Sequence, residues 1–147
     1  MKSIKENKKA YFDYEILDEL ITGIVLVGSE VKSIKLGNVN LRGTYLKFIN
    51  GELYLTNMHV GSYKPAGKNG HENERERKLL IKKTELLKLA TKTDIKGNSL
   101  VPLELLLKDN LIKVKIALVR GKKQYEKKQV IKEREQNREI RRKLKNF

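Results

Sequence analysis

The chain has 147 residues and a formal net charge of +15, from 33 Lys/Arg against 18 Asp/Glu. This length suffices for one ordinary hydrophobic core, so we expect one domain with an arm. The absence of Cys excludes a disulfide framework and a thiolate site, and favours a reducing, cytoplasmic compartment. The longest apolar run, residues 21–27, is well short of the ~20 residues of a membrane helix, so no membrane span or membrane partner is expected.

The first half of the chain predicts a basic lead-in, two strands and a helix. Residues 1–9 hold four lysines and are interpreted as mobile. Apolar and acidic side chains alternate over residues 11–18, and residues 21–27 are apolar and partly β-branched, which predicts an antiparallel pair of strands. Residues 29–37 predict a short helix that begins at the capping residue Ser29 and ends at Gly37.

The second half predicts hairpins. Asn50-Gly51 between two apolar runs is a strong hairpin signal, because both residues tolerate the positive φ of a type I′ turn. The further elements expected are a polar loop over 61–76, a strand over 77–81, a helix over 84–95, and a hairpin of 99–108 with 111–119. Six or seven short strands with two short helices predict a mainly β fold over residues 1–120, an OB-type antiparallel β-barrel with short flanking helices.

Residues 121–147 form a basic C-terminal tail, with eleven Lys/Arg against four Glu. Only Ile140, Leu144 and Phe147 share a helical face, which is too little apolar surface to form a core. We therefore expect a segment that is disordered alone and helical on a polyanion, whether RNA, DNA or a lipid surface. A lipid surface is the least favoured target, because amphipathic membrane helices have a broader apolar face.

The residues offer little for catalysis. There is no Gly-rich phosphate loop and no spaced cluster of metal ligands, so no enzyme, cofactor or metal site is expected. His59 is interpreted as a structural histidine and His71 as part of a solvated loop. The acids of residues 13–19 are interpreted as a solvated strand surface rather than a magnesium site.

Basic residues recur across the predicted barrel and its edges, which indicates contact with nucleic acid. They are Lys8, Lys9, Lys32, Lys35, Lys82, Lys83, Lys113, Lys115, Lys122 and Lys123. Tyr125 lies in the basic run and has two open interpretations, stacking on a base or anchoring against the barrel.

Six blocks of sequence, in order along nearly the whole chain, resemble the SsrA-binding protein (SmpB) family. The blocks are NKKA, GSEVKSIKLG, NGELYLTNMHV, RKLLI, LVPL and RGKKQYEKK, followed by the basic tail. The resemblance implies an OB-type barrel that binds the tRNA-like part of transfer-messenger RNA and delivers it to stalled ribosomes for trans-translation, without catalysis. It implies three partners: transfer-messenger RNA, the small ribosomal subunit at its decoding centre and mRNA channel, and elongation factor Tu through the shared RNA. A ribosomal or general RNA-binding OB-barrel protein is the alternative.

The resemblance also implies site residues. An RNA-binding surface would include Lys8, Lys9, Glu30, Lys32, Lys35, Asn40, Leu80, Lys113, Lys122 and Lys123. Tyr125, Glu126, Lys127 and Lys128 would lie in the decoding centre. Two departures from the family pattern stand out. Ile21-Thr22-Gly23 replaces Glu-Ala-Gly, which removes a carboxylate, and Lys128 replaces Arg, which removes a bidentate phosphate contact.

Overall fold

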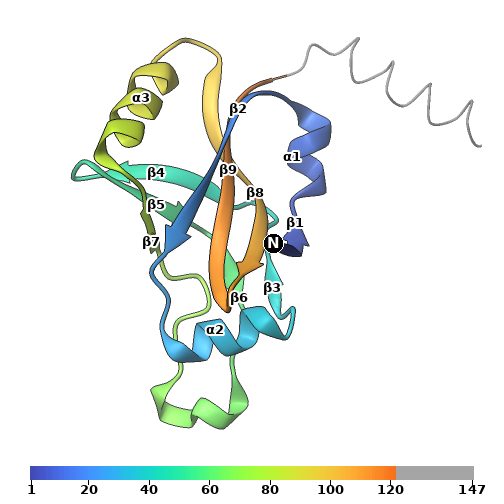
Figure 1. The fold of residues 1–147 in the computed structure, drawn as a ribbon. Helices are drawn as coiled ribbons and strands as arrows, with labels where there is room; N and C mark the ends of the chain where they lie inside the picture. Colours follow the sequence, from blue (N-terminus) through green and yellow to red (C-terminus); the bar gives the residue numbers. More distant parts are fainter. Residues whose placement is uncertain (122–147) are drawn as a thin grey trace, which may run out of the picture.

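The computed structural model describes residues 1–121, apart from the side chains of Lys68 and Asn69. Figure 1 shows the course of these residues. The expectations for the tail, including its disorder, its helix and the roles of Lys122, Lys123 and residues 125–128, lie outside the described residues. The division of the chain near residue 120 into barrel and tail therefore stays a prediction.

One antiparallel sheet of seven strands, in the order β1-β8-β9-β2-β7-β5-β4, organises the fold. Its strands are β1 Lys2–Glu6, β2 Tyr14–Ile24, β4 Tyr45–Ile49, β5 Glu52–Thr56, β7 Arg77–Leu80, β8 Asn98–Lys108 and β9 Leu111–Gly121. A second, small ladder joins β3 Val39–Asn40 to β6 His59–Val60. The helices are α1 Lys8–Asp13, α2 Gly28–Lys35, the 3-10 helix η1 Lys64–Asn69 and α3 Lys83–Thr93.

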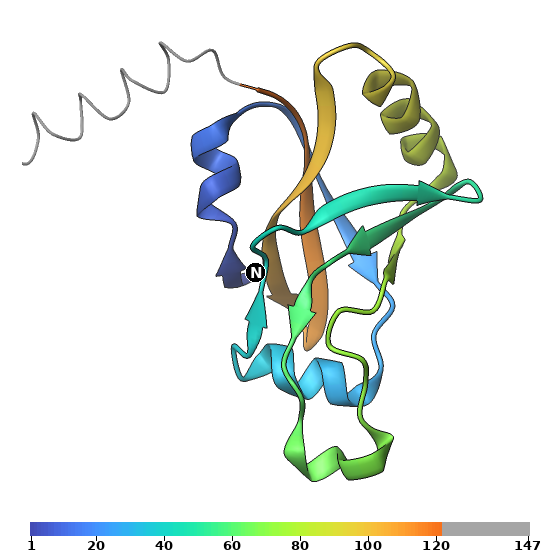
Figure 2. The ribbon, with the colours of Figure 1, turned by 180° about the vertical axis from the view of Figure 1, so that it is seen from behind.

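The sheet curls, so that its edge strand β4 comes close to β8 (Figures 1 and 2). No ladder joins these two strands among the residues that the structure describes, and β1 pairs with β8 from Glu104 to Leu107. The mainly β fold with short flanking helices is thus confirmed. The barrel has an open seam between β4 and the first half of β8.

The curl encloses the main hydrophobic core, and α1 covers a smaller one. Fully buried residues of the main core are Ile34, Leu53, Leu55, Met58, Val60, Leu79, Leu105, Val114 and Ile116. The smaller cluster joins Ala10 of α1 to Val101, Leu103, Ala117 and Val119 of β8 and β9. Burial of these side chains is the main source of stability for a domain of this size.

The amino-terminal segment differs from its prediction. The lead-in contains strand β1, which pairs with β8, and residues 8–13 form helix α1 instead of continuing a strand. The Asn7 side-chain oxygen accepts from the Ala10 amide at 3.3 Å, while its amide nitrogen donates to the Pro102 carbonyl at 3.0 Å. Capping by Asn7 and burial of Ala10 against the second cluster outweigh the local alternation that favoured a strand.

Strand β2 also corrects a prediction. The two short strands expected over residues 11–18 and 21–27 do not pair with each other; residues 14–24 form one continuous strand. It pairs with β9 along most of its length and with β7 at its end, with an irregular register between Ile16 and Asp18. Residues 17–20 contain no glycine or proline that would end the strand, so a hairpin there had no turn to support it.

The other elements agree with the prediction. Asn50 and Gly51 have φ values of 51° and 76°, as a type I′ turn requires, and Asp109 and Asn110 form a similar turn with φ values of 49° and 66°. Helix α2, strand β7, helix α3 and the β8–β9 hairpin lie where expected. The polar loop of residues 61–76 contains the short η1 helix.

Candidate nucleic-acid interface

The cationic hollow is an open depression lined by basic residues of β1, α1 and the turn after β3. Lys5, Lys8, Lys9, Asn40 and Arg42 line it, with Glu6 as the one carboxylate among its lining residues. The side-chain oxygen of Asn40 accepts from the Arg42 amide at 2.8 Å, which fixes the turn that carries Arg42. The structure thus brings together the predicted residues Lys8, Lys9 and Asn40, and adds Lys5 and Arg42.

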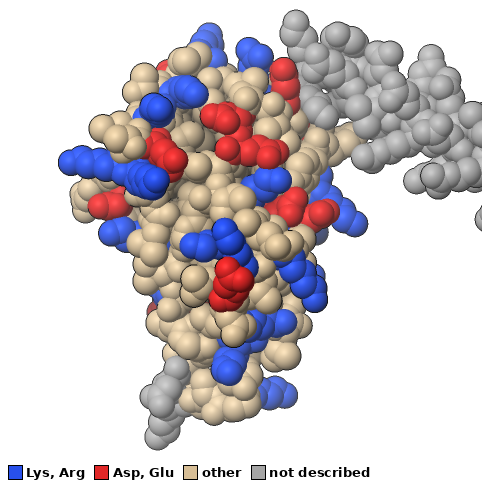
Figure 3. All heavy atoms as spheres, in the orientation of Figure 1, with Lys and Arg blue, Asp and Glu red and all other residues tan. Residues whose placement is uncertain are grey.

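Helix α2 continues this basic surface. Its exposed face carries Lys32 and Lys35. Lys35 and Leu36 line a further depression together with Lys2 of β1, and the Lys35 ammonium lies 3.4 Å from the side-chain oxygen of Asn110. In Figure 3, the charged side chains in the lower part of the visible face, over α2, are mostly Lys and Arg, whereas acidic and basic side chains are mixed in the upper part.

The Gly23 shelf is a second candidate contact surface, formed by Ile21, Gly23, Leu80 and Lys113 on the outer face of β2, β7 and β9. Gly23 lies opposite Leu80 on one side and opposite Lys113 on the other. A Cβ at Gly23 would lie 3.1 Å from the Leu80 Cβ, so glycine allows Leu80 to lie close over β2. Leu80 is 55% exposed and Ile21 is 45% exposed. Two predicted RNA-contact residues, Leu80 and Lys113, therefore share one surface.

Ile21 stands where the family pattern has a glutamate, and a neighbouring residue offers a carboxylate. Ile21 pairs with Lys115 across β2 and β9. The Lys115 ammonium lies 3.2 Å from a carboxylate oxygen of Glu19, two residues before Ile21 on the same strand. A carboxylate is thus present beside the shelf, although it is held in an ion pair.

Glu30, which was predicted to lie on an RNA-contact surface, is a buried residue of α2. Its side chain is 0% exposed. One carboxylate oxygen accepts from Arg75 and the other from Arg77, and the Val27 amide donates to the first at 3.0 Å. With both oxygens occupied and no exposed surface, Glu30 cannot contact RNA directly in this structure, and that prediction is wrong. Its role is to tie α2 to β7 and the preceding loop.

The environment of Glu30 changes its ionisation. Burial alone would raise the pKa of this carboxyl, but hydrogen bonds from Arg75, the Val27 amide and Arg77 together hold the pKa below its usual value. Arg77 is itself fully buried, and burial lowers its pKa. Its guanidinium also donates to the Met58 and Asn73 carbonyls at 2.8 and 3.1 Å. The pair is therefore fully hydrogen-bonded, as a buried charge requires.

The loop of residues 61–76 is fastened to α2 by His71, which we expected to be solvated. His71 is half-buried, and its Nε2 donates to the Val60 carbonyl at 3.0 Å. Its Nδ1 lies 2.7 Å from the Ser29 hydroxyl oxygen, within hydrogen-bond distance. The solvated interpretation of His71 is wrong, and so is the capping role of Ser29, because α2 begins at Gly28 with Val27 as its N-cap. His59 is exposed and its Nδ1 lies 3.0 Å from Glu74.

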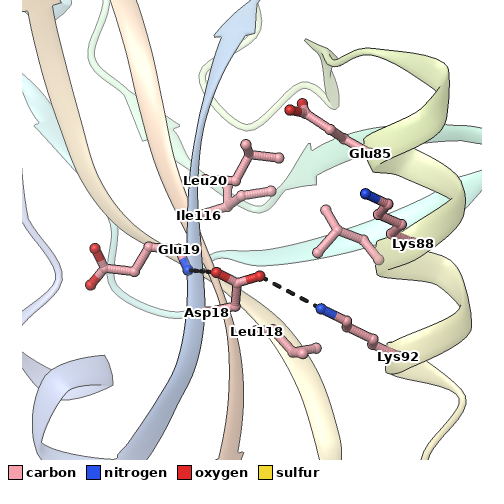
Figure 4. Close-up of a pocket in the computed structure, with 9 residues that line it drawn as sticks. Asp18, Glu19, Leu20, Glu85, Lys88, Lys92, Ile116 and Leu118 are labelled. Atoms are coloured by element: carbon pink, nitrogen blue, oxygen red, sulfur yellow. Dashed lines mark hydrogen bonds and ion pairs between the residues drawn. The ribbon is translucent and has the colours of Figure 1, made fainter.

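A pocket between α3 and β2 has an apolar floor and a charged rim (Figure 4). Leu20, Leu89, Ile116 and Leu118 form the floor, and Lys92 reaches from α3 to Asp18 on β2 at 3.7 Å. The charge of Lys92 is therefore partly neutralised by Asp18. Within residues 1–121, no group of three His, Cys, Asp or Glu side chains could hold a metal ion, and no helix is long and apolar enough to cross a membrane.

The fold and these surfaces define a class: a curled antiparallel sheet of the OB type whose lysines and arginines gather on particular faces, as in nucleic-acid-binding barrels. The sequence comparisons identify the family. The SmpB protein family model matches residues 4–146, and the chain belongs to this family.

Its curated relatives are SsrA-binding proteins. That of Persephonella marina is 46% identical over 99% of this chain and 95% of its own length. That of Carboxydothermus hydrogenoformans is 48% identical over 95% of this chain and 93% of its own, and that of Staphylococcus aureus strain Newman is 44% identical over 97% and 93%. A chain from a solved structure described as "tmRNA-SmpB: a journey to the center of the bacterial ribosome" superposes with a TM-score of 0.69 at 41% identity, covering 83% of this chain and 86% of that one.

Proposed function

We propose that this chain binds the tRNA-like domain of transfer-messenger RNA and delivers it to stalled bacterial ribosomes for trans-translation. Membership of the SmpB family over residues 4–146 is the observation that carries the proposal. The names of the relatives and the ribosome-bound solved relative support the same RNA and the same site of action. The role is one of binding, and a ribosomal site of action implies the cytoplasm.

Two surfaces of the described residues support RNA contact. The cationic hollow offers Lys5, Lys8, Lys9 and Arg42, none of which forms an ion pair within residues 1–121. The Gly23 shelf offers an apolar surface beside Lys113. Phosphates on the hollow and sugars or bases on the shelf are the contacts that such groups make with folded RNA.

The finer partners belong to the same proposal. Elongation factor Tu would join through the shared RNA. The tail, with Tyr125, Glu126, Lys127 and Lys128, would enter the decoding centre and the mRNA channel of the small subunit. Lys122 and Lys123 would contact RNA at the start of the tail. Lys32 and Lys35 on the exposed face of α2 complete the proposed RNA surface.

A pull-down tests the proposal. The protein is purified from its native host under mild salt, and the bound RNA is sequenced. We expect strong enrichment of one RNA that carries a tRNA-like end. A broad mixture of RNAs would instead support a general RNA-binding or ribosomal protein.

Truncation tests whether residues 1–121 recognise the RNA while the tail is required for ribosome rescue. Removal of residues 122–147 is expected to leave affinity for the tRNA-like RNA nearly intact and to abolish ribosome rescue in a reconstituted translation system. Loss of RNA binding in the truncated chain would show that residues 1–121 are not the recognition module.

A further inference from the structure

The open seam of the barrel holds a pocket that is separate from the Gly23 shelf. Asn7, Lys9, Tyr14, Thr44 and Tyr45 line it, together with Asp13 and the buried Val101 of β8. The pocket exists because β4 approaches β8 without forming a ladder, so that side chains instead of backbone hydrogen bonds border the gap.

The hydroxyl group of Thr44, a residue that lines this pocket, is buried without a hydrogen-bond partner in the described part of the chain. The residue is 7% exposed. A buried hydroxyl without a partner is unfavourable by about 1–3 kcal/mol, and native structures rarely leave one without a reason. The hydroxyl oxygen exposes less than 1 Å² of surface, so a ligand in the pocket does not reach it, and the recognition of a ligand here depends on the other lining residues.

Two tyrosines line the same pocket. Tyr14 is half-buried at the start of β2, and Tyr45 is 48% exposed at the start of β4. Exposed aromatic rings beside polar groups are the usual means by which proteins hold an unpaired base, because every base has a face on which a ring can stack.

The pocket adjoins the cationic hollow. Asn7, Lys9 and Gly43 line both. Phosphate is favoured in the hollow, where four cations stand against Glu6, whereas Lys9 is the one cation among the residues that line the pocket. A nucleotide therefore fits across the two with its phosphate on Lys9 and Arg42 and its base in the pocket.

We propose that the Tyr14–Thr44–Tyr45 pocket seats one unpaired nucleobase of the bound RNA, whose phosphate lies in the cationic hollow. This inference rests on the proposed RNA-binding function and adds a base-binding site to it. Tyr45 stacks on the base.

Nuclear magnetic resonance of the full chain tests the proposal with two probes, adenosine 5′-monophosphate and ribose 5-phosphate. We expect the first to shift the amide signals of Gly43, Thr44 and Tyr45, and the second to shift only signals of the hollow. Tyr45→Ala is expected to lower the affinity for adenosine 5′-monophosphate about tenfold, because a stacking contact with the base is lost. Tyr45→Phe is expected to lower it by less than about twofold. Phe48→Ala, a change at another exposed aromatic residue of β4 that does not line the pocket, serves as the matched control.

Equal shifts and equal affinities for the two probes would overturn the base site, and this comparison needs only the unaltered chain. Equal effects of Tyr45→Ala and Phe48→Ala would overturn it as well. A binding measurement with a transcript of the tRNA-like RNA separates this failure from that of the proposed function. If the transcript binds tightly while the base-dependent shifts are absent, only the pocket is refuted; if the transcript does not bind tightly, the proposed function is.

Discussion

The strand β2 region and the cationic hollow are both rich in lysine and arginine. Within residues 1–121, the cations of the β2 region are paired with carboxylates, whereas those of the hollow are not. Glu15, Asp18 and Glu19 of β2 each pair with a cation. These cations are Arg120 at 3.4 Å, Lys92 at 3.7 Å and Lys115 at 3.2 Å. In the hollow, Lys5, Lys8, Lys9 and Arg42 form no ion pair with any residue of the described part of the chain.

A count of lysines alone therefore does not locate an RNA surface. A phosphate that approaches the β2 region meets carboxylates at the same distance as the cations, so attraction and repulsion nearly cancel. A phosphate in the hollow meets mainly cations, and its binding releases counterions. The pairing of each charge in three dimensions therefore decides which basic residues are available to RNA.

The largest expected effect is on stability, at the buried pair of Glu30 and Arg77. Here the paired side chains are both buried, so the stability of the fold depends on the pairing of their charges. Glu30→Ala leaves the buried Arg77 guanidinium without its counter-charge, which is expected to destabilise the fold by about 3–5 kcal/mol. Asp18→Asn breaks an exposed pair with Lys92 and is expected to change stability little. Urea unfolding of both variants measures the difference. Equal losses would mean that burial does not distinguish the two pairs.

The same pair predicts a pH dependence. Because the pKa of Glu30 is lowered in the folded chain, its contribution to stability is present above its ordinary pKa of 4.5 and is lost as the pH falls through the lower folded value. We expect the free energy of unfolding to fall below about pH 4.5, and to fall less steeply in Glu30→Gln. Urea unfolding at a series of pH values checks the slopes; the same slope in both proteins would assign the acid sensitivity to other carboxylates.

The next largest effect is expected on RNA affinity, when unpaired cations of the hollow and paired charges of the β2 region are removed in separate variants. A triple change of Lys8, Lys9 and Arg42 to Ala is expected to weaken the tRNA-like RNA about tenfold to a hundredfold at moderate salt, with a salt slope smaller by about 2–3. The matched control changes both members of the three ion pairs Glu15–Arg120, Asp18–Lys92 and Glu19–Lys115 to Ala, so that each cation is removed together with its carboxylate, and little loss is expected. Filter binding at several salt concentrations measures both. Similar losses in the two variants would mean that ion pairing on β2 does not reduce contact with RNA.

The sequence predicted those parts of the fold that local chemistry determines. Asn50-Gly51 predicts its turn because few other residue pairs adopt two positive φ values, and the run 111–119 predicts β9 because apolar and basic residues alternate. The predicted structure of the first fourteen residues was wrong because their actual structure depends on partners that are distant in the sequence. Asn7 hydrogen-bonds to Pro102, and β1 pairs with β8, about a hundred residues further along the chain.

The candidate site was predicted in part for the same reason. Lys8, Lys9 and Asn40 meet in one hollow, but Arg42 was missed because nothing local distinguishes it from any exposed arginine. Glu30 was assigned to the RNA surface by resemblance, whereas its burial follows from Arg75 and Arg77, 45 and 47 residues away. A glutamate at the third position of a helix was a signal for its bond to the Val27 amide only.

The smallest effect is expected at the Gly23 shelf, where geometry and not charge is altered. Gly23→Ala places a Cβ 3.1 Å from the Leu80 Cβ, and because the backbone fixes the position of a Cβ, the end of β7 must move by a few tenths of an ångström, which we expect to occur without unfolding. We expect RNA affinity to fall about threefold, equivalent to about 0.6 kcal/mol, with an unchanged salt slope because no cation is lost. Gly28→Ala is the control, since a Cβ there meets no atom within 4 Å. Equal RNA affinities of the two variants would show that the position of Leu80 does not matter, and would leave the cationic hollow as the surface on which the affinity of residues 1–121 depends.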